Sequence, residues 1–292
     1  MLRGLIVLAI TAVGATASAP VRADDRPAMQ LFAAVAAPAP LSPEPIGAYT
    51  NGCLAGAVAL ADSGPNWQTM RSSRNRHFGT PVLVAFLEQL ARDAAAHDGW
   101  PGLLIGDLSQ PRGGPMRDGH ASHQIGLDAD IWLTPMPERR LSPDEREHLP
   151  EAPVCRMGPH AVEERVWTDA HARILRRAAL DPRVARIFVA PGIKKKLCDT
   201  TLDDRGWLRK VRPWYGHNAH FHVRLACPPA TRCTEQAPPP AGDGCGADLD
   251  WWYSPEPYKG PAAPASAAKP ATLDDLPAAC RGVLSAAIAA EP

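Results

Sequence analysis

The sequence predicts an α+β protein: a single domain with a small antiparallel sheet, flanked by helices and by long loops that disulfides tie together. Two short segments alternate strictly between apolar and polar residues and predict paired strands. The strand candidates are few and dispersed, which argues against regular βαβ winding. The 32 prolines among 292 residues favour loops and turns, and that proline content is roughly twice the average usage.

The first 23 residues predict a secretory signal peptide. A short basic start precedes an apolar run at Leu5–Ala19, and small residues at −3 and −1 allow cleavage after Ala19 or after Ala23. We expect cleavage after Ala23, because the earlier cut would leave Pro20 at the new N-terminus. The alternative, an uncleaved anchor, needs an apolar stretch of about 20 residues. We expect no membrane span in the mature chain.

Charge and cysteine usage narrow the class of protein further. Lys plus Arg and Asp plus Glu balance at 31 each, which argues against binding to nucleic acid or lipid by bulk charge. The seven cysteines form no CxxC or zinc-finger spacing, and in an exported chain they favour disulfides. Cys227 and Cys233 enclose a short loop and could bridge locally, and the odd count leaves one thiol over.

The remaining elements follow from periodicity and caps. Pro81–His97 predicts an amphipathic helix, with Thr80 as its N-cap and proline in its first turn. Proline and alanine dominate Pro261–Thr272 as in a linker, so we divide the chain into a signal peptide (1–23), a main domain (24–260) and a tail (261–292). The other predicted elements are a strand at Leu103–Leu108, a helix at Glu163–Leu180, a strand at Arg186–Ala190 and a short helix within Leu276–Ala289.

The two alternating segments carry the chemistry. In Leu127–Leu133, Asp128 and Asp130 share the polar face, because successive side chains of a strand point to opposite faces. In Ala219–Leu225, His220 and His222 share the polar face in the same way. If the two strands pair, imidazoles and a carboxylate converge on one side of the sheet.

Five of the ten histidines lie in two short clusters, at 119–130 and 217–222. Two histidines and one carboxylate with an open position form the ligand set of a catalytic zinc, and a spare imidazole beside them can act as a base or stabilise an oxyanion. The alternatives are a purely structural metal and ordinary hydrogen-bonded histidines. The chain has no HExxH, GxSxG, P-loop or GxGxxG motif.

The spacing His123-x6-Asp130 followed by His220-x-His222 resembles the signature of the metallopeptidase superfamily that includes lysostaphin-type enzymes, D-Ala-D-Ala peptidases and the hedgehog fold. Longer strings closely resemble the penicillin-insensitive murein endopeptidases, and the resemblance runs from about Gly47 to Cys280. These strings are SQPRGGPMRDGHASHQIGLDADI (109–131), RIFVAPGIKKKLC (186–198), WLRKVRPWYGHNAHFHVRLACP (207–228) and PPPAGDGCGADLDWW (238–252).

The resemblance implies roles for individual residues. His123, Asp130 and His222 match the zinc ligands, His220 matches the histidine that assists catalysis, and His120 matches a residue that can join a second metal. Asp128 is expected to hold a ligand imidazole in place. The expected substrate contacts are Arg112, Ser122, His217, Trp214 and Tyr215. Loop hydrogen bonding is the alternative role for Arg112 and Ser122, and packing is the alternative for Trp214 and Tyr215.

The resemblance also implies the disulfides 53–280, 198–245 and 227–233. Cys155 is left unmatched, in agreement with the odd count. His160 matches a further residue of the second metal site, but Met157 stands where the family has an aspartate, so the number of metal ions stays open.

The implied reaction is hydrolysis of D-alanyl–meso-diaminopimelyl cross-links in murein by a zinc-dependent endopeptidase of the periplasm. We keep two alternatives: a D-Ala-D-Ala carboxypeptidase or dipeptidase, with Arg112 as carboxylate clamp, and a non-catalytic, metal-containing wall-binding module. The expected partner is cross-linked peptidoglycan, and a homodimer is one oligomeric state that the resemblance leaves open.

Overall fold

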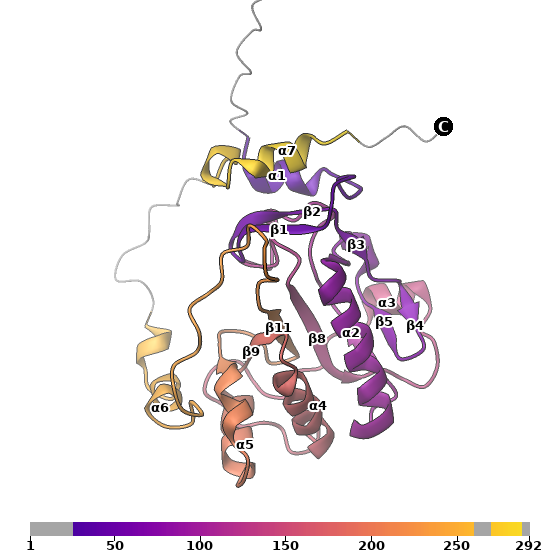
Figure 1. Cartoon of the computed structure of the whole chain (residues 1–292). Helices are drawn as coiled ribbons and strands as arrows, with labels where there is room; N and C mark the ends of the chain where they lie inside the picture. Colours follow the sequence, from indigo (N-terminus) through magenta and orange to yellow (C-terminus); the bar gives the residue numbers. More distant parts are fainter. Residues whose placement is uncertain (1–25, 260–269, 288–292) are drawn as a thin grey trace, which may run out of the picture.

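The computed structural model describes residues 26–259 and 270–287. The expected signal peptide at residues 1–23 and most of the expected linker lie outside these residues. Within them, the backbone forms a mixed sheet with helices packed against it, as Figure 1 shows.

The main sheet has seven strands in the order β10-β9-β11-β8-β7-β5-β4. It is larger than the expected sheet and is mixed, because β5 pairs with β7 and β9 pairs with β10 in parallel. Parallel neighbours need a crossover connection, and the chain supplies one through α2 and another through α5. The strands span β4 (Ser63–Gly64), β5 (Trp67–Thr69), β7 (Leu103–Ile105), β8 (Asp128–Pro135), β9 (Val184–Val189), β10 (Val211–Pro213) and β11 (His220–Leu225).

The two alternating segments form the centre of this sheet. Strands β8 and β11 pair antiparallel, with His222 opposite Asp130 and Arg224 opposite Asp128. The pairing on which the sequence argument depended is therefore confirmed. The apolar residues of both strands belong to the main core: Ala129, Ile131, Leu133, Phe221, Val223 and Leu225.

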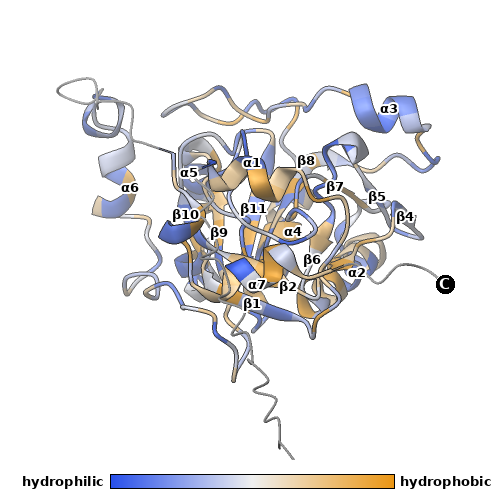
Figure 2. Ribbon diagram, turned by 90° about the horizontal axis from the view of Figure 1, so that it is seen from above, coloured by the Kyte–Doolittle hydropathy of each residue, from blue (hydrophilic) through white to orange (hydrophobic). Residues whose placement is uncertain are grey.

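Helices α2, α4 and α5 lie in front of the sheet in the view of Figure 1 and fill that core. Helix α3 has no buried residue and is hydrophilic along its length in Figure 2. The helices span α1 (Ala28–Ala33), α2 (Pro81–Asp93), α3 (Pro143–His148), α4 (Asp169–Leu180), α5 (Pro191–Thr200), α6 (Ala247–Trp252) and α7 (Ala279–Ser285).

Local signals explain where the helices begin. Thr80 caps α2 by accepting a hydrogen bond from the Leu83 backbone N–H at 3.3 Å, as predicted. Helix α4 begins six residues later than predicted, because Thr168 has extended backbone and serves as its N-cap. The turn at 163–167 that precedes it lies outside the helix.

Two small two-stranded sheets and the terminal helices form a cap at one end of the main sheet (Figure 1). The first of these is the hairpin of β1 (Glu44–Ala48) with β2 (Asn51–Ala55), and the second is the antiparallel pair of β3 (Val58–Ala59) with β6 (Phe78–Gly79), which are separated in the chain by β4 and β5. Helices α1 and α7 lie together over β1 and β2 in Figure 1 and share a second apolar cluster. The C-terminal segment therefore packs onto the main body of the protein.

Three disulfides fasten this arrangement. Cys53–Cys280 joins β2 to α7, Cys198–Cys245 joins α5 to the loop before α6, and Cys227–Cys233 closes a local loop. These are the pairs that the resemblance implies. Among the described residues Cys155 is the free cysteine; it is buried, and burial raises the pKa of its thiol to about 11.

No helix in the described part of the chain has the length and apolar character that crossing a bilayer requires.

Replacing both Cys53 and Cys280 by alanine is expected to lower the free energy of unfolding by about 2–5 kcal/mol, because this bond closes the longest loop of the three. Denaturant unfolding of the oxidised protein measures the change. The matched control is Cys227→Ala with Cys233→Ala. It opens a loop closed over a sequence separation of only six residues and is expected to lower the free energy of unfolding by less. Equal losses would contradict the proposed fastening of α7.

Candidate metal centre and pocket

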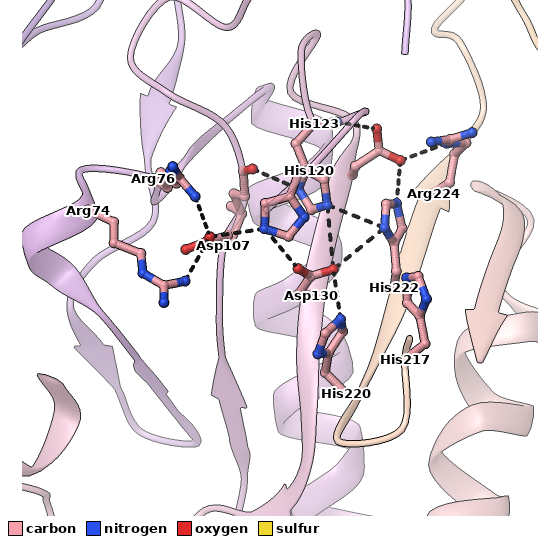
Figure 3. A network of polar contacts seen from close by, with 12 residues as sticks. Arg74, Arg76, Asp107, His120, His123, Asp130, His217, His220, His222 and Arg224 are labelled. Atoms are coloured by element: carbon pink, nitrogen blue, oxygen red, sulfur yellow. Dashed lines mark hydrogen bonds and ion pairs between the residues drawn. The ribbon is translucent and has the colours of Figure 1, made fainter. Parts of the chain in front are cut away.

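Three side chains from two strands and one loop converge on the polar face of the sheet, as Figure 3 shows. His123 Nε2 lies 3.3 Å from His222 Nδ1, and each of these atoms lies 3.5 Å from Asp130 Oδ1. All three residues are buried. The structure therefore brings together the two imidazoles and the carboxylate that the sequence spacing singled out.

Hydrogen bonds on the far side of each ring set which nitrogen faces the cluster. His123 Nδ1 donates to the Leu108 carbonyl at 2.7 Å, and His222 Nε2 donates to Asp128 Oδ1 at 2.7 Å. The opposite nitrogens are then left as lone-pair donors that point at Asp130. This is the way in which outer hydrogen bonds orient metal-binding histidines.

The backbone of the loop before β8 is bent to place His123. His123 itself has a φ of +66°, and Gly126 has a φ of +69°. At Gly126 a Cβ atom would lie 2.4 Å from a Leu54 methyl carbon and 3.1 Å from the Thr80 backbone nitrogen, so glycine is required there. A left-handed conformation at a non-glycine residue costs about 1–3 kcal/mol and is concentrated at functional sites.

Two buried carboxylates carry the negative charge of the cluster. Burial raises the pKa of Asp128, but Arg224 and His222 outweigh it and hold that pKa well below its usual range. Burial also raises the pKa of Asp130, and the nearby His220 and His123 bring it well below the usual range. Both carboxylates are therefore ionised and have to be matched by positive charge.

The charge on Asp130 is poorly matched by hydrogen bonds. Its Oδ1 atom is buried and has no hydrogen-bond partner among the described residues. An ionised oxygen without a partner inside a protein is costly. Burial lowers the pKa of His123, whereas Asp130 raises it above its usual value, so the space between them favours a positive charge. The donor set and the unpartnered oxygen fit a divalent cation.

His120 and Asp107 extend the cluster on one side. His120 Nε2 lies 3.0 Å from Asp107 Oδ2 and 3.6 Å from Asp130 Oδ2, and Arg74 and Arg76 pair with the same Asp107 oxygen. His120, His123 and Asp130 offer ligand atoms within 4.8 Å of one another. Asp107 was not predicted, although an acid two residues after the apolar run at Leu103–Ile105 is a signal for a site residue.

Two further histidines stand beside the cluster with contrasting electrostatics. Burial lowers the pKa of His220, but Asp130 and Glu151 outweigh it and raise that pKa to about 9. Burial, reinforced by His222, lowers the pKa of His217 to about 3. His220 Nδ1 lies 3.1 Å from Glu151 Oε2, and His217 Nδ1 donates to the Tyr215 carbonyl at 2.7 Å. The cluster thus has beside it one imidazole that favours the cationic form, His220, and one that favours the neutral form, His217; of the two, His217 lines the cavity described next.

A cavity of about 470 Å³ opens onto this cluster. Four of the five residues that the sequence named as substrate contacts line it: Ser122, His217, Trp214 and Tyr215. Trp214 and Tyr215 are 49% and 47% exposed, and each also packs against the Trp252 ring, so both keep surface for a ligand. The lining also includes residues that the sequence did not single out as site residues: Thr50, Arg186, Phe188, Arg224 and Gln236.

Arg112 does not line this cavity. Its guanidinium is buried and donates to the carbonyls of Ala37, Val283 and Leu284 at 3.2, 2.9 and 2.6 Å. These contacts correspond to the hydrogen-bonding alternative, and they fasten α7 rather than a ligand. His160 is exposed. Among the described residues, the group with ligand atoms within 4.8 Å of one another is His120, His123 and Asp130, and it includes neither His160 nor His222.

Replacing Arg112 by methionine is expected to lower the free energy of unfolding by about 2–4 kcal/mol, because one buried and two partly buried carbonyls lose a charged donor. Denaturant unfolding measures the loss. The control is Arg209→Met, since Arg209 is exposed and donates to two loop carbonyls. An unchanged stability of the Arg112 variant would show that these contacts do not hold the cap.

Comparison with known proteins assigns the family. A family model described as penicillin-insensitive murein endopeptidase matches residues 45–285. A protein of that name from Haemophilus influenzae is 48% identical over 246 residues, which cover 82% of each chain. Its counterpart from Pectobacterium atrosepticum is 40% identical over 99% of this chain and 100% of its own. The chain belongs to the penicillin-insensitive murein endopeptidase family.

Proposed function

We propose that the protein is a zinc-dependent murein endopeptidase that hydrolyses D-alanyl–meso-diaminopimelyl cross-links. The observation that carries the proposal is the convergence of His123, Asp130 and His222 beside a cavity of about 470 Å³ that His222 lines. Family membership supports the endopeptidase activity. The unpartnered Asp130 oxygen supports the metal.

We assign the metal to His123 Nε2, His222 Nδ1 and the Asp130 carboxylate, with His120 beside them. When bound there, zinc polarises a carbonyl and lowers the pKa of a coordinated water to about 7. Asp128 acts as a positioning residue, because it accepts the Nε2–H of His222 and the His123 backbone N–H. Arg224 holds the same carboxylate in place through a 2.7 Å contact.

We assign His220 to proton handling in the reaction. Its Nδ1 is engaged by Glu151, so its Nε2 is the atom directed at Asp130, at 3.8 Å. From this position Nε2–H can donate to the oxyanion of the tetrahedral intermediate or give its proton to the leaving amine. Both roles use the same atom. His217, which is neutral, lines the cavity beside it and is assigned with Ser122, Trp214 and Tyr215 to substrate contact.

The alternatives receive less support. A carboxypeptidase built on Arg112 as carboxylate clamp lacks that clamp, because the Arg112 guanidinium is committed to backbone carbonyls. A non-catalytic module would not require a further imidazole, besides those of His123 and His222, at the position of His220. We further propose that residues 1–23 direct export and that residues 24–260 form the peptidase domain, acting in the periplasm on cross-linked peptidoglycan.

Incubation of the mature, oxidised protein with a purified cross-linked muropeptide dimer is expected to give monomers, detected by mass spectrometry. A chelator is expected to abolish the conversion, and added zinc to restore it. His220→Ala is expected to lower kcat/KM by about 10²–10⁴-fold, since it removes a positioned proton donor. The control is His148→Ala, because His148 lies exposed on α3.

Three outcomes would count against the proposal. Release of a single D-alanine with the cross-link intact would identify a carboxypeptidase. An intact dimer in the presence of stoichiometric zinc would favour the wall-binding module. Full conversion in the presence of chelator would remove the metal from the reaction.

A further inference from the structure

Two arginines stand directly opposite each other on the polar face of the sheet, in the wall of the cavity. Arg186 on β9 pairs in register with Arg224 on β11. Both line the cavity together with His222 and Phe188. Like charges opposite one another across two strands destabilise a sheet. The pair therefore needs an explanation that its packing does not provide.

The charge on Arg224 is matched within the protein. Its Nε donates to Asp128 Oδ1 at 2.7 Å and its Nη1 donates to Gln236 Oε1 at 2.8 Å. Its guanidinium also lies 4.2 Å from the centre of the Tyr49 ring. Arg224 thus belongs to the support of the metal ligands through Asp128.

The charge on Arg186 is not matched in this way. Its Nη2 donates to the Ala237 carbonyl at 2.8 Å, and its guanidinium lies 5.9 Å from the centre of the Phe188 ring. Within residues 26–259 and 270–287 no carboxylate forms an ion pair with it. Glu235, the acid on the neighbouring loop, is engaged by the Tyr49 hydroxyl and the Cys227 backbone N–H at 2.9 and 2.6 Å. Arg186 therefore keeps donor capacity and charge for a ligand in the cavity.

The surroundings of Arg186 disfavour its positive charge as long as no anion is bound beside it. Burial and the nearby charges of Arg224 and Arg212 lower the pKa of Arg186 below its usual value. A carboxylate placed against the guanidinium would remove the repulsion and form charge-assisted hydrogen bonds, to which arginine is well suited in a bidentate geometry.

We propose that Arg186 is a specificity-determining residue that binds a substrate carboxylate, namely the one on the carbon that carries the scissile nitrogen. The inference rests on the proposed function, because it takes its substrate from the D-alanyl–meso-diaminopimelyl cross-link. In that cross-link the diaminopimelyl carbon bonded to the scissile nitrogen also carries a free carboxylate.

The register of the sheet fixes the distance between Arg186 and the cluster of His123, Asp130 and His222, and this distance suits a carboxylate close to the scissile bond. Phe188 lies opposite His222, one of the three converging residues. Arg186 comes two residues before Phe188 on β9 and lies opposite Arg224. Two residues of a strand span roughly 7 Å. A carboxylate one carbon away from the scissile nitrogen can therefore reach Arg186 while the scissile bond lies at the cluster.

The test combines protein variants with a changed substrate. Two cross-linked dimers are compared, one with the free carboxylate beside the scissile nitrogen and one with that carboxyl amidated. A third dimer, amidated at another carboxyl of the stem peptide, identifies which carboxylate is recognised. The variants are Arg186→Gln, Arg186→Lys and the control Arg209→Gln; Arg209 donates to carbonyls of the same loop but does not line the cavity.

We expect amidation beside the scissile nitrogen to lower kcat/KM of the unaltered protein by roughly 10- to 100-fold, the effect of losing a hydrogen bond to a charged group. Arg186→Gln is expected to lose a similar factor on the free-carboxylate dimer and to lose little more on the amidated one. Arg186→Lys is expected to recover part of the loss, and Arg209→Gln to behave like the unaltered protein. Equal amidation effects in the unaltered protein and in Arg186→Gln would overturn the proposal, and so would recognition of the other carboxyl.

A binding measurement separates this inference from the proposed function. Calorimetric titration with a stem peptide that contains meso-diaminopimelate, free or amidated at the same carboxyl, needs no turnover. Tighter binding of the free form that disappears in Arg186→Gln supports the inference even if no dimer is cleaved. Equal affinities of both peptides for both proteins would overturn it, whatever the cleavage assay shows.

Discussion

The antiparallel pairing of β8 with β11 is the constraint on which the site depends. Its register sets His222 opposite Asp130 and Arg224 opposite Asp128, so four interacting groups share one face while the opposite face enters the core. A slip of one residue would send His222 into the core and Phe221 to the site, because side chains alternate along a strand. Such a slip would disrupt both the site and the apolar core. The apolar residues that stabilise the sheet therefore also fix the site.

The charges on the polar face of β8 and β11 then determine which kind of ligand this face can bind. Asp128 is satisfied by His222, Arg224 and the His123 backbone. One oxygen of Asp130, in contrast, is buried and has no hydrogen-bond partner in the described chain, although three imidazoles lie 3.5–3.8 Å from it. In the proposed function these two carboxylates, two residues apart, therefore have different roles: Asp128 orients the proposed metal ligands, and Asp130 would bind the cation. The left-handed backbone at His123 and His217 fits the same account, since strain of this kind persists where the surrounding structure enforces it.

The sequence predicted the parts of the site that lie on alternating strands, because a period of two fixes which side chains share a face. It also located α2 through Thr80 and Pro81. It missed the parallel strands β5 and β10, which are three residues each and show no period. Arg112 stands in a string that resembles the family, yet its role depends on α7, distant in sequence. The roles of Asp107 and Arg186 could likewise not be predicted, because they depend on residues that are distant in sequence and that only the fold brings near.

X-ray absorption spectroscopy at the zinc edge tests the central claim most directly, because it reports the ligands rather than the activity. For the zinc-loaded protein the account predicts two imidazoles and carboxylate or water oxygens at about 2.0–2.2 Å. In the His222→Ala variant it predicts the loss of one imidazole from that shell. A shell containing sulfur, or one that is unchanged in the variant, would contradict the claim that paired strands β8 and β11 build the metal site.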